Sequence, residues 1–384
     1  MLQSTKDILA DLIAFPTVSS DSNLEMIAYL AARLEDCGAD VHLFADPSGN
    51  KANLFATLGP KKDGGIVLSG HSDVVPVTDQ SWTSDPFVMT ERDGRLYGRG
   101  SCDMKGFIAT TIAMAPTFAR SVRDRPLHFA FTYDEEVGCI GAAHLAQSLA
   151  QLGIRPSVAI IGEPTNMRII KGHKGCYEYT TRFQGLEGHG SAPDLGVNAV
   201  EYAARYITHL LGLKEQLHGM SPPDSAFDPP WTTVNVGALH GGSVHNVIAP
   251  KAQVDWEMRP VQQSDADFVK SHLYAYCHEV LLPKMRAVYP DAWIETKVVG
   301  EVEGLVPTLE NEALQIVSEL TGTDDASLVP FGTEGGIFQN IGMDVVVCGP
   351  GSIEQAHKAD EFVTVSQLES CTAMLSKLSK RLGR

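Results

Sequence analysis

The feature that most constrains this fold is the alternation of strand-like and helix-like segments across the first 180 residues. Strand candidates rich in β-branched and aromatic residues are ANLFATLG, GGIVLSGH, LHFAFTY and SVAIIGE. The helical stretches GFIATTIAMAPTFA and GAAHLAQSL lie between them. A further helical pattern at 24–38, LEMIAYLAARLEDCG, precedes the strands and ends at a glycine, as helix C-termini commonly do. This order predicts a mostly parallel sheet covered on both faces. Right-handed crossovers would then bring the ends of the strands, and the loops after them, to one edge.

The middle of the chain follows a different pattern. YEYTTRFQG, WTTVNVGALHGG and APKAQVDWEMRP alternate as antiparallel strands do, and two long helical segments separate them. We interpret 181–293 as an α+β domain inserted into an α/β domain formed by 1–180 and 294–384. The Pro/Asp-rich stretch at 221–230 is a loop inside the insert.

Charge and cysteine usage limit the class of protein. The formal net charge of the 384 residues is -17, which argues against nucleic acid or an anionic membrane as a partner. No apolar run approaches the roughly 18 residues of a membrane span, and the first 15 residues resemble an amphipathic helix, not a secretory signal. Seven scattered cysteines without a CxxC pair fit reduced thiols, so we expect a cytoplasmic protein.

Polar side chains follow the predicted strands where each one ends. His71 and Asp73 lie two residues apart at a strand end, so Asp73 could accept one imidazole N–H while the other nitrogen binds a metal. Asp103 lies in the glycine-flanked loop GRLYGRGSCDMKG before a helix. A plain helix cap is the alternative for this aspartate.

Later strand ends supply further donor groups. FTYDEEVG contributes Glu135 and Glu136, SVAIIGEPTN contributes Glu163, and the loop GPGSIEQAHKADEFV contributes His357. Two histidines with three carboxylates suit zinc, cobalt or manganese. Five ligands exceed the need of one catalytic zinc but suit two metals that share a carboxylate. A solvated acidic turn is the alternative for the DEE block, and we expect it to hold for Asp134.

These residues lie in a series of blocks that resemble the M20 family of metallo-amidohydrolases. In family order, the blocks are SGHSDVVP, YGRGSCDMKG, TYDEEVG, GEPT, GHGSAPDLGVNA, MRP, GTEGG and GPGSIEQAHKADEFV. The resemblance spans nearly the whole chain. It implies an α/β catalytic domain of the zinc-exopeptidase type with a mostly parallel sheet, an inserted α+β dimerisation domain, and a homodimer.

The resemblance also implies the roles of the donor groups. It places metal ligands at His71, Asp103, Glu136, Glu163 and His357. Asp103 would bridge two divalent ions, Zn²⁺ or else Co²⁺. Glu135 would be the general base, and Asp73 would support His71.

Residues outside this set would bind substrate. The resemblance implies that His189 reaches the partner's active site and stabilises an oxyanion, and that Asn246 and Arg259 help to bind a carboxylate-bearing substrate. Gly332 and Thr333, in FGTEGG, would also touch it.

Simpler interpretations of these residues remain open. His189 could be a turn residue, Arg259 could pair with a local acid, and Thr333 with Glu334 could cap the next helix. We predict no function for three further residues: His173 and His245, expected at the surface or in loops, and Cys102, which lacks an activating histidine.

The implied activity is hydrolysis of the amide bond of a small N-acylated amino acid. GTEGG differs from the GTSDGR-like stretch of the desuccinylases in the family, and GPGSIEQAH is similar to its deacetylases. Another deacylase or a dipeptidase of the family is the alternative. A non-catalytic binding relative is the alternative of another class, but such a protein should have lost a ligand or the base.

Overall fold

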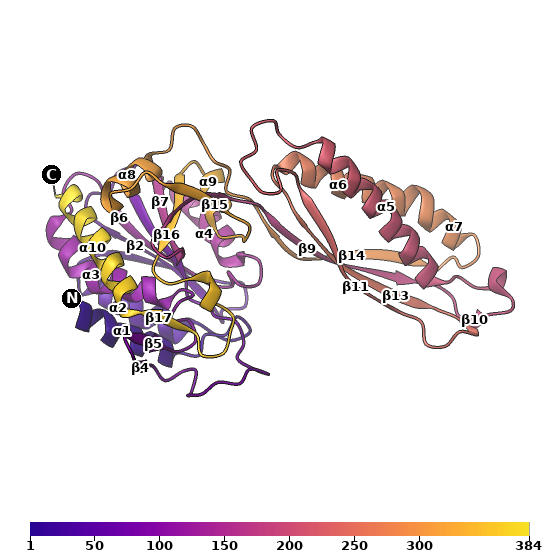
Figure 1. Ribbon diagram of the computed structural model, residues 1–384, viewed down its shortest axis with the longest axis horizontal. Helices are drawn as coiled ribbons and strands as arrows, with labels where there is room; N and C mark the ends of the chain where they lie inside the picture. Colours follow the sequence, from indigo (N-terminus) through magenta and orange to yellow (C-terminus); the bar gives the residue numbers. More distant parts are fainter. Residues whose placement is uncertain (384) are drawn as a thin grey trace. The chain divides into compact units, whose positions relative to one another are not determined.

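The computed structural model describes residues 1–383 and divides into two compact units (Figure 1). The first unit contains 1–172, 307–328 and the chain from 333 onward; the second contains 173–306 and 329–332. These boundaries differ from the expected insert at 181–293. The difference arises because the strand Cys176–Gln184 begins the sheet of the second unit and the strand Trp293–Val302 completes it.

The first unit carries an eight-stranded sheet in the order β1-β2-β6-β3-β7-β16-β8-β15. Its strands are β1 (Asp40–Ala45), β2 (Ala52–Leu58), β3 (Ile66–His71), β6 (Leu127–Thr132), β7 (Val158–Pro164), β8 (Ile169–His173), β15 (Ala326–Val329) and β16 (Asp344–Gly349). The four central strands, β6, β3, β7 and β16, run parallel. β1, β2 and β8 pair antiparallel with their neighbours. The predicted α/β fold with a mostly parallel sheet is confirmed.

Helices cover this sheet. They are α1 (Leu2–Ala14), α2 (Leu24–Glu35), α3 (Lys105–Ser121), α4 (Ile140–Leu152), α8 (Glu312–Thr321), α9 (Gly335–Asn340) and α10 (Val365–Leu382). One hydrophobic core joins α1, α2, α3, α8 and α10 to alternate residues of the strands, among them Leu68 and Phe129. α4 and α9 pack against each other and against β2, β6 and β16. A small sheet of β4 (Thr90–Arg92), β5 (Arg95–Tyr97) and β17 (Phe362–Thr364) completes the unit.

Gly162, just before the end of β7, is a close-packing position beside the candidate site. A Cβ at Gly162 would lie 1.9 Å from Cγ of the fully buried Phe107 on α3. We expect Gly162→Ala to lower the free energy of unfolding by about 1–3 kcal/mol, the usual effect of overpacking a core. Urea unfolding measures this change. Gln147→Ala, on the exposed side of α4, is the control and should change stability by less than about 0.5 kcal/mol.

The second unit is an antiparallel α+β layer. Its sheet has the order β11-β13-β9-β14. The strands of this sheet are β9 (Cys176–Gln184), β11 (Thr233–Gly241), β13 (Lys251–Arg259) and β14 (Trp293–Val302), and β10 (Gly188–His189) pairs separately with β12 (Val247–Ile248). The helices are α5 (Ala199–Gly219), α6 (Gln263–Ala275), a π-helical turn (Tyr276–Leu281) and α7 (Leu282–Arg286). Alternate residues of β9, such as Tyr179 and Phe183, are buried against α5 and α6, as the period of two requires. Among residues 1–383, no helix combines the length and apolar character needed to cross a bilayer.

Candidate metal centre

The five predicted ligands converge at one edge of the large sheet. His71 is the last residue of β3, Glu163 lies near the end of β7, and Glu136 follows β6. Asp103 lies in the loop before α3, and His357 lies in the loop after β16. Because β6, β3, β7 and β16 are parallel neighbours, their carboxyl ends meet at this edge.

The potential donor atoms form two groups that share Asp103. His71, Asp103 and Glu163 offer donor atoms within 4.8 Å of one another, and so do Asp103, Glu136 and His357. His71 Nε2 lies 3.0 Å from Asp103 Oδ1, while His357 Nε2 lies 3.5 Å from the other oxygen of this carboxylate. The two oxygens of Asp103 therefore face two different histidines.

Electrostatics at this edge favour a bound cation. Burial and the nearby Asp103 charge raise the pKa of Glu163 well above its usual value, and the same two causes raise the pKa of Glu136. Hydrogen bonds to Asp103 and Glu136 raise the pKa of His357 to about 10. Burial opposes ionisation of Asp103, but hydrogen bonds with His357 and His71 lower its pKa. Crowded carboxylates of this kind need positive charge between them.

The donor set fits divalent metals. Glu163 Oε1 is buried and makes no hydrogen bond within the described chain, as a ligand oxygen would. His71 Nδ1 lies 2.9 Å from the main-chain oxygen of Asp73, which can only accept, so Nδ1 carries a hydrogen. The other nitrogen, Nε2, faces Asp103 and is the one that could coordinate a metal. Imidazole and carboxylate ligands suit zinc-like ions.

Asp73 acts on the site differently from the prediction. The sequence led us to expect its carboxylate as the acceptor of the His71 ring N–H, but the main-chain oxygen is the closer partner, and Asp73 Oδ1 lies 3.6 Å from Nδ1. The carboxylate accepts hydrogen bonds from Ser19 Oγ and from the backbone N–H groups of Glu135 and Glu136. Asp73 therefore connects the end of β3 to the acidic loop.

Glu135 is close to both donor groups but belongs to neither. Its pKa is raised well above the usual value because burial removes water from the carboxyl, and the charges of Glu136 and Asp103 add to the effect. Cys139 donates its S–H to Glu135 Oε1 at 3.6 Å. A carboxyl that lies outside both donor groups and has a raised pKa is suited to acid and base chemistry.

A sheet edge with two groups of potential metal ligands, a carboxylate shared between them and an adjacent glutamate outside both groups is typical of metal-dependent hydrolases. The model of peptidase family M20/M25/M40 matches residues 67–381. The chain is 35% identical to the acetylornithine deacetylase of Photorhabdus laumondii over 97% of its own length and 95% of that protein. It is also 35% identical to the acetylornithine deacetylase of Proteus mirabilis, over 97% of its own length and 95% of that protein. The chain therefore belongs to the M20 family, as its sequence blocks predict.

Solved structures share the fold. A tripeptidase from Staphylococcus aureus matches 100% of this chain and 99% of its own with a TM-score of 0.74 at 18% identity. An M20 family metallo-carboxypeptidase from Sulfolobus solfataricus matches 98% of each chain with a TM-score of 0.74 at 16% identity. A dinuclear metal binding peptidase from Bacillus subtilis matches 99% of this chain and 98% of its own with a TM-score of 0.64 at 17% identity.

Most of the predicted substrate-binding residues lie in the second unit. His189 on β10 is exposed and pairs with Val247 on β12, beside the exposed Asn246, whose main-chain oxygen accepts the N–H of Gly190. Ser191 N donates to His189 Nδ1, so Nε2 carries the ring hydrogen and is available as a donor. Arg259, at the end of β13, is paired with a local acid, Glu257, at 2.7 Å.

The residues of the GTEGG segment belong to different units and make different contacts. Gly332 belongs to the second unit and Thr333 to the first. Thr333 Oγ1 accepts the N–H of Gly335, so it caps the turn into α9 as the simpler interpretation expects. Glu334 does not cap that helix. Its buried carboxylate accepts hydrogen bonds from Ser69 Oγ and Thr132 Oγ1 on two adjacent strands, and burial raises its pKa to about 7.

Two simpler expectations were wrong. Asp134 is not a solvated turn residue, because its side chain is buried and pairs with Lys51. His173 is not at the surface, because it is buried at the end of β8, where its ring contacts the main-chain oxygen of Lys174. His245 is exposed, as expected. Cys102 is buried, and its Sγ lies 3.2 Å from the Ser352 oxygen.

Sequence reasoning missed two buried charged residues beside the centre, Arg99 and Glu361. They form an ion pair with N–O distance 2.7 Å, and each is 1% exposed. Each lies a few positions from a predicted ligand, Arg99 in GRLYGRG and Glu361 in HKADEFV, and this nearness was the available signal. The pairing of Arg99 with Glu361 is not apparent from the sequence, because the two residues are 262 positions apart.

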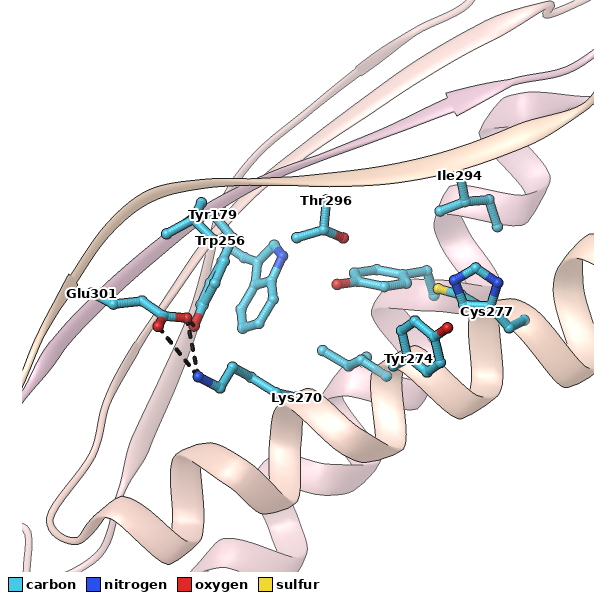
Figure 2. A pocket seen from close by; sticks show the side chains of 12 residues that line it. Tyr179, Trp256, Lys270, Tyr274, Cys277, Ile294, Thr296 and Glu301 are labelled. Atoms are coloured by element: carbon cyan, nitrogen blue, oxygen red, sulfur yellow. Dashed lines mark hydrogen bonds and ion pairs between the residues drawn. The ribbon is translucent and has the colours of Figure 1, made fainter.

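Apart from the sheet edge of the first unit, a pocket lies wholly within the second unit. Figure 2 shows this pocket between α6 and the sheet. Its volume is about 360 Å³, and Tyr179 stacks on Trp256 in its wall. Its charged side chains, Lys270 and Glu301, pair with each other. The lining contains none of the residues predicted from the sequence. We therefore assign the chemistry to the sheet edge of the first unit.

Proposed function

We propose that the chain is an N²-acetylornithine deacetylase, which hydrolyses the acetyl amide to ornithine and acetate. The observation that carries the proposal is the pair of ligand groups sharing Asp103, with Glu135 beside them and outside both. The relatives named acetylornithine deacetylase, each 35% identical over nearly the whole chain, support the choice of substrate.

The centre would hold two divalent ions, Zn²⁺ in the first place and Co²⁺ as the alternative. His71 and Glu163 would complete one position, Glu136 and His357 the other, and Asp103 would bridge them. When bound, such ions lower the pKa of water toward neutrality and polarise the acyl oxygen. The two groups of donors within 4.8 Å support this assignment.

A side chain of the protein would accept and then donate the proton in the reaction. Glu135 would take a proton from water and return it to the leaving amine, which requires a carboxyl that is not a ligand. Asp73 would hold the backbone N–H groups of Glu135 and Glu136, and its main-chain oxygen would fix the ring of His71. These three contacts support a fixed position of the two glutamates beside His71.

The second unit would supply substrate contacts and the dimer. His189, a ring N–H donor, would stabilise the oxyanion in the partner's active site. Arg259 would bind the substrate α-carboxylate, which would compete with Glu257 for the guanidinium. Asn246 and Gly332 of this unit, and Thr333 of the first unit, would also contact the substrate.

This function belongs to arginine biosynthesis and to the cytoplasm. The seven scattered cysteines, none of them in a CxxC pair, support a reducing compartment. We propose a homodimer because His189 is exposed on a different compact unit from the metal ligands.

A comparison of substrates tests the proposal. We expect purified enzyme with added Zn²⁺ to have a kcat/KM for N²-acetylornithine at least about tenfold above that for N-succinyl-diaminopimelate or N-acetylmethionine, since one wrongly paired polar group accounts for that much discrimination. Ninhydrin detection of the released amine measures it. Faster turnover of N-succinyl-diaminopimelate, of another N-acyl amino acid or of a dipeptide would instead assign the chain to another deacylase or dipeptidase of the family.

A non-catalytic binding relative is the alternative of another class. The complete set of ligands and the free Glu135 favour an enzyme. Absence of turnover with every substrate of the panel, in protein shown to contain metal, would favour the binding protein.

A further inference from the structure

Glu361, Arg99 and Gln80 form a continuous set of contacts that joins two loops of the candidate centre. One loop carries Asp103, the residue shared by both ligand groups, and the other carries His357. None of the three residues belongs to either ligand group. We call them the Glu361–Arg99–Gln80 network.

The first part of the network holds the Asp103 loop. Glu361 Oε1 accepts the backbone N–H of Cys102 at 2.8 Å and that of Asp103 at 3.0 Å. Glu361 Oε2 accepts the N–H of Gly100 at 3.1 Å. One buried carboxylate therefore binds three N–H groups of the turn that presents the shared ligand.

The second part continues to the His357 loop. Arg99 Nη1 donates to Glu361 Oε2 at 2.7 Å, and Arg99 Nη2 donates to Gln80 Oε1. Gln80 Nε2 then donates to the main-chain oxygen of His357 at 2.9 Å. The network thus connects the backbone of Asp103 to the backbone of His357 through three side chains.

His357 needs such support more than His71 does. Its side chain is 54% exposed, whereas that of His71 is 1% exposed. Its backbone has a φ of +62°, in the left-handed region that residues other than glycine rarely adopt. Packing alone therefore holds the His357 ring weakly, and a hydrogen bond to its main chain restricts the loop.

We propose that the Glu361–Arg99–Gln80 network is a positioning device that sets the distance between Asp103 and His357 and so tunes the affinity of the metal position that these two residues share with Glu136. The inference rests on the proposed metal centre. Groups that support ligands in this way commonly change metal affinity about 10- to 100-fold when they are removed.

Two variants remove different ends of the network. Glu361→Gln replaces the carboxylate with an amide whose NH₂ must face either the N–H donors or Arg99. Gln80→Glu keeps an acceptor for Arg99 but removes the donor to the His357 oxygen. Because Gln80 is only partly buried, the second variant should fold even if the first does not. Glu369→Gln, on the exposed side of α10, is the matched control.

The measurement is titration of metal-free, full-length protein with Zn²⁺ by calorimetry in competition with a chelator. We expect wild type and Glu369→Gln to bind two ions. Glu361→Gln and Gln80→Glu should lose about 10- to 100-fold in affinity at one position and keep the other. Saturating Zn²⁺ should restore kcat with KM unchanged, which a general loss of stability would not produce.

The outcomes separate this inference from the proposed function. If wild type binds two ions and the folded variants bind them with unchanged affinity, the positioning role is wrong and the metal centre stands. If Glu361→Gln does not fold, unchanged binding by Gln80→Glu alone overturns the inference. If wild type binds no Zn²⁺, the proposed function fails and the inference fails with it.

Discussion

Glu135→Gln should lower kcat about 10²- to 10⁴-fold while leaving the metal content unchanged, because it removes a proton acceptor but no ligand. Glutamine has the same shape and keeps the backbone N–H that Asp73 accepts. Loss of water around the carboxyl raises its pKa, which makes its carboxylate a stronger base toward a proton from water. Steady-state kinetics and elemental analysis of the same preparation measure the two effects.

The neighbouring glutamate supplies the control for this experiment. Glu136→Gln should lose metal as well as activity, since Glu136 belongs to a ligand group with Asp103 and His357. Full activity in Glu135→Gln would show that another group is the base. Loss of metal from Glu135→Gln would show that this residue is a ligand.

Asp103→Asn should have the largest effect on metal binding, because Asp103 is the residue shared by both groups. The amide cannot supply two anionic oxygens, and the two histidines that face this carboxylate would lose their common partner. We expect the affinity loss to exceed the roughly 10- to 100-fold that accompanies removal of a group one step further from the metal. Activity should fall with it.

Elemental analysis after dialysis and activity at increasing Zn²⁺ measure this loss. Asp124→Asn, in an exposed loop, is the control and should retain both ions. An Asp103→Asn protein that keeps two ions at wild-type affinity would contradict the bridging role.

The convergence of the predicted ligands at one edge could be predicted because the alternation of elements determines where parallel strands end. His71, Glu136 and Glu163 follow or end three adjacent parallel strands, so sequence order alone places them at one edge. The same reasoning predicts the α/β class. It does not determine which atom makes each contact. For this reason the hydrogen bond from His71 to the main chain of Asp73, in place of its side chain, was not predicted.

Features that depend on distant pairing could not be predicted. β14 shows little alternation because most of its residues, including Val298 and Val299, are exposed, so its first residues looked like the end of the insert. The pair of Asp134 with Lys51 joins positions 83 residues apart. Buried charges such as Glu334 and Glu361 resemble surface residues in sequence, since charged residues are usually exposed.

The unequal exposure of the two histidines has a kinetic consequence. His71 and Glu163 are buried, whereas more than half of the His357 side chain contacts solvent. Solvent could therefore reach a metal ion held by His357, but it could not reach one held by His71 and Glu163 unless the surrounding chain moved. At limiting metal we therefore expect the protein to retain a slowly exchanging first ion and to gain or lose the second quickly, so that metal supply regulates the second position.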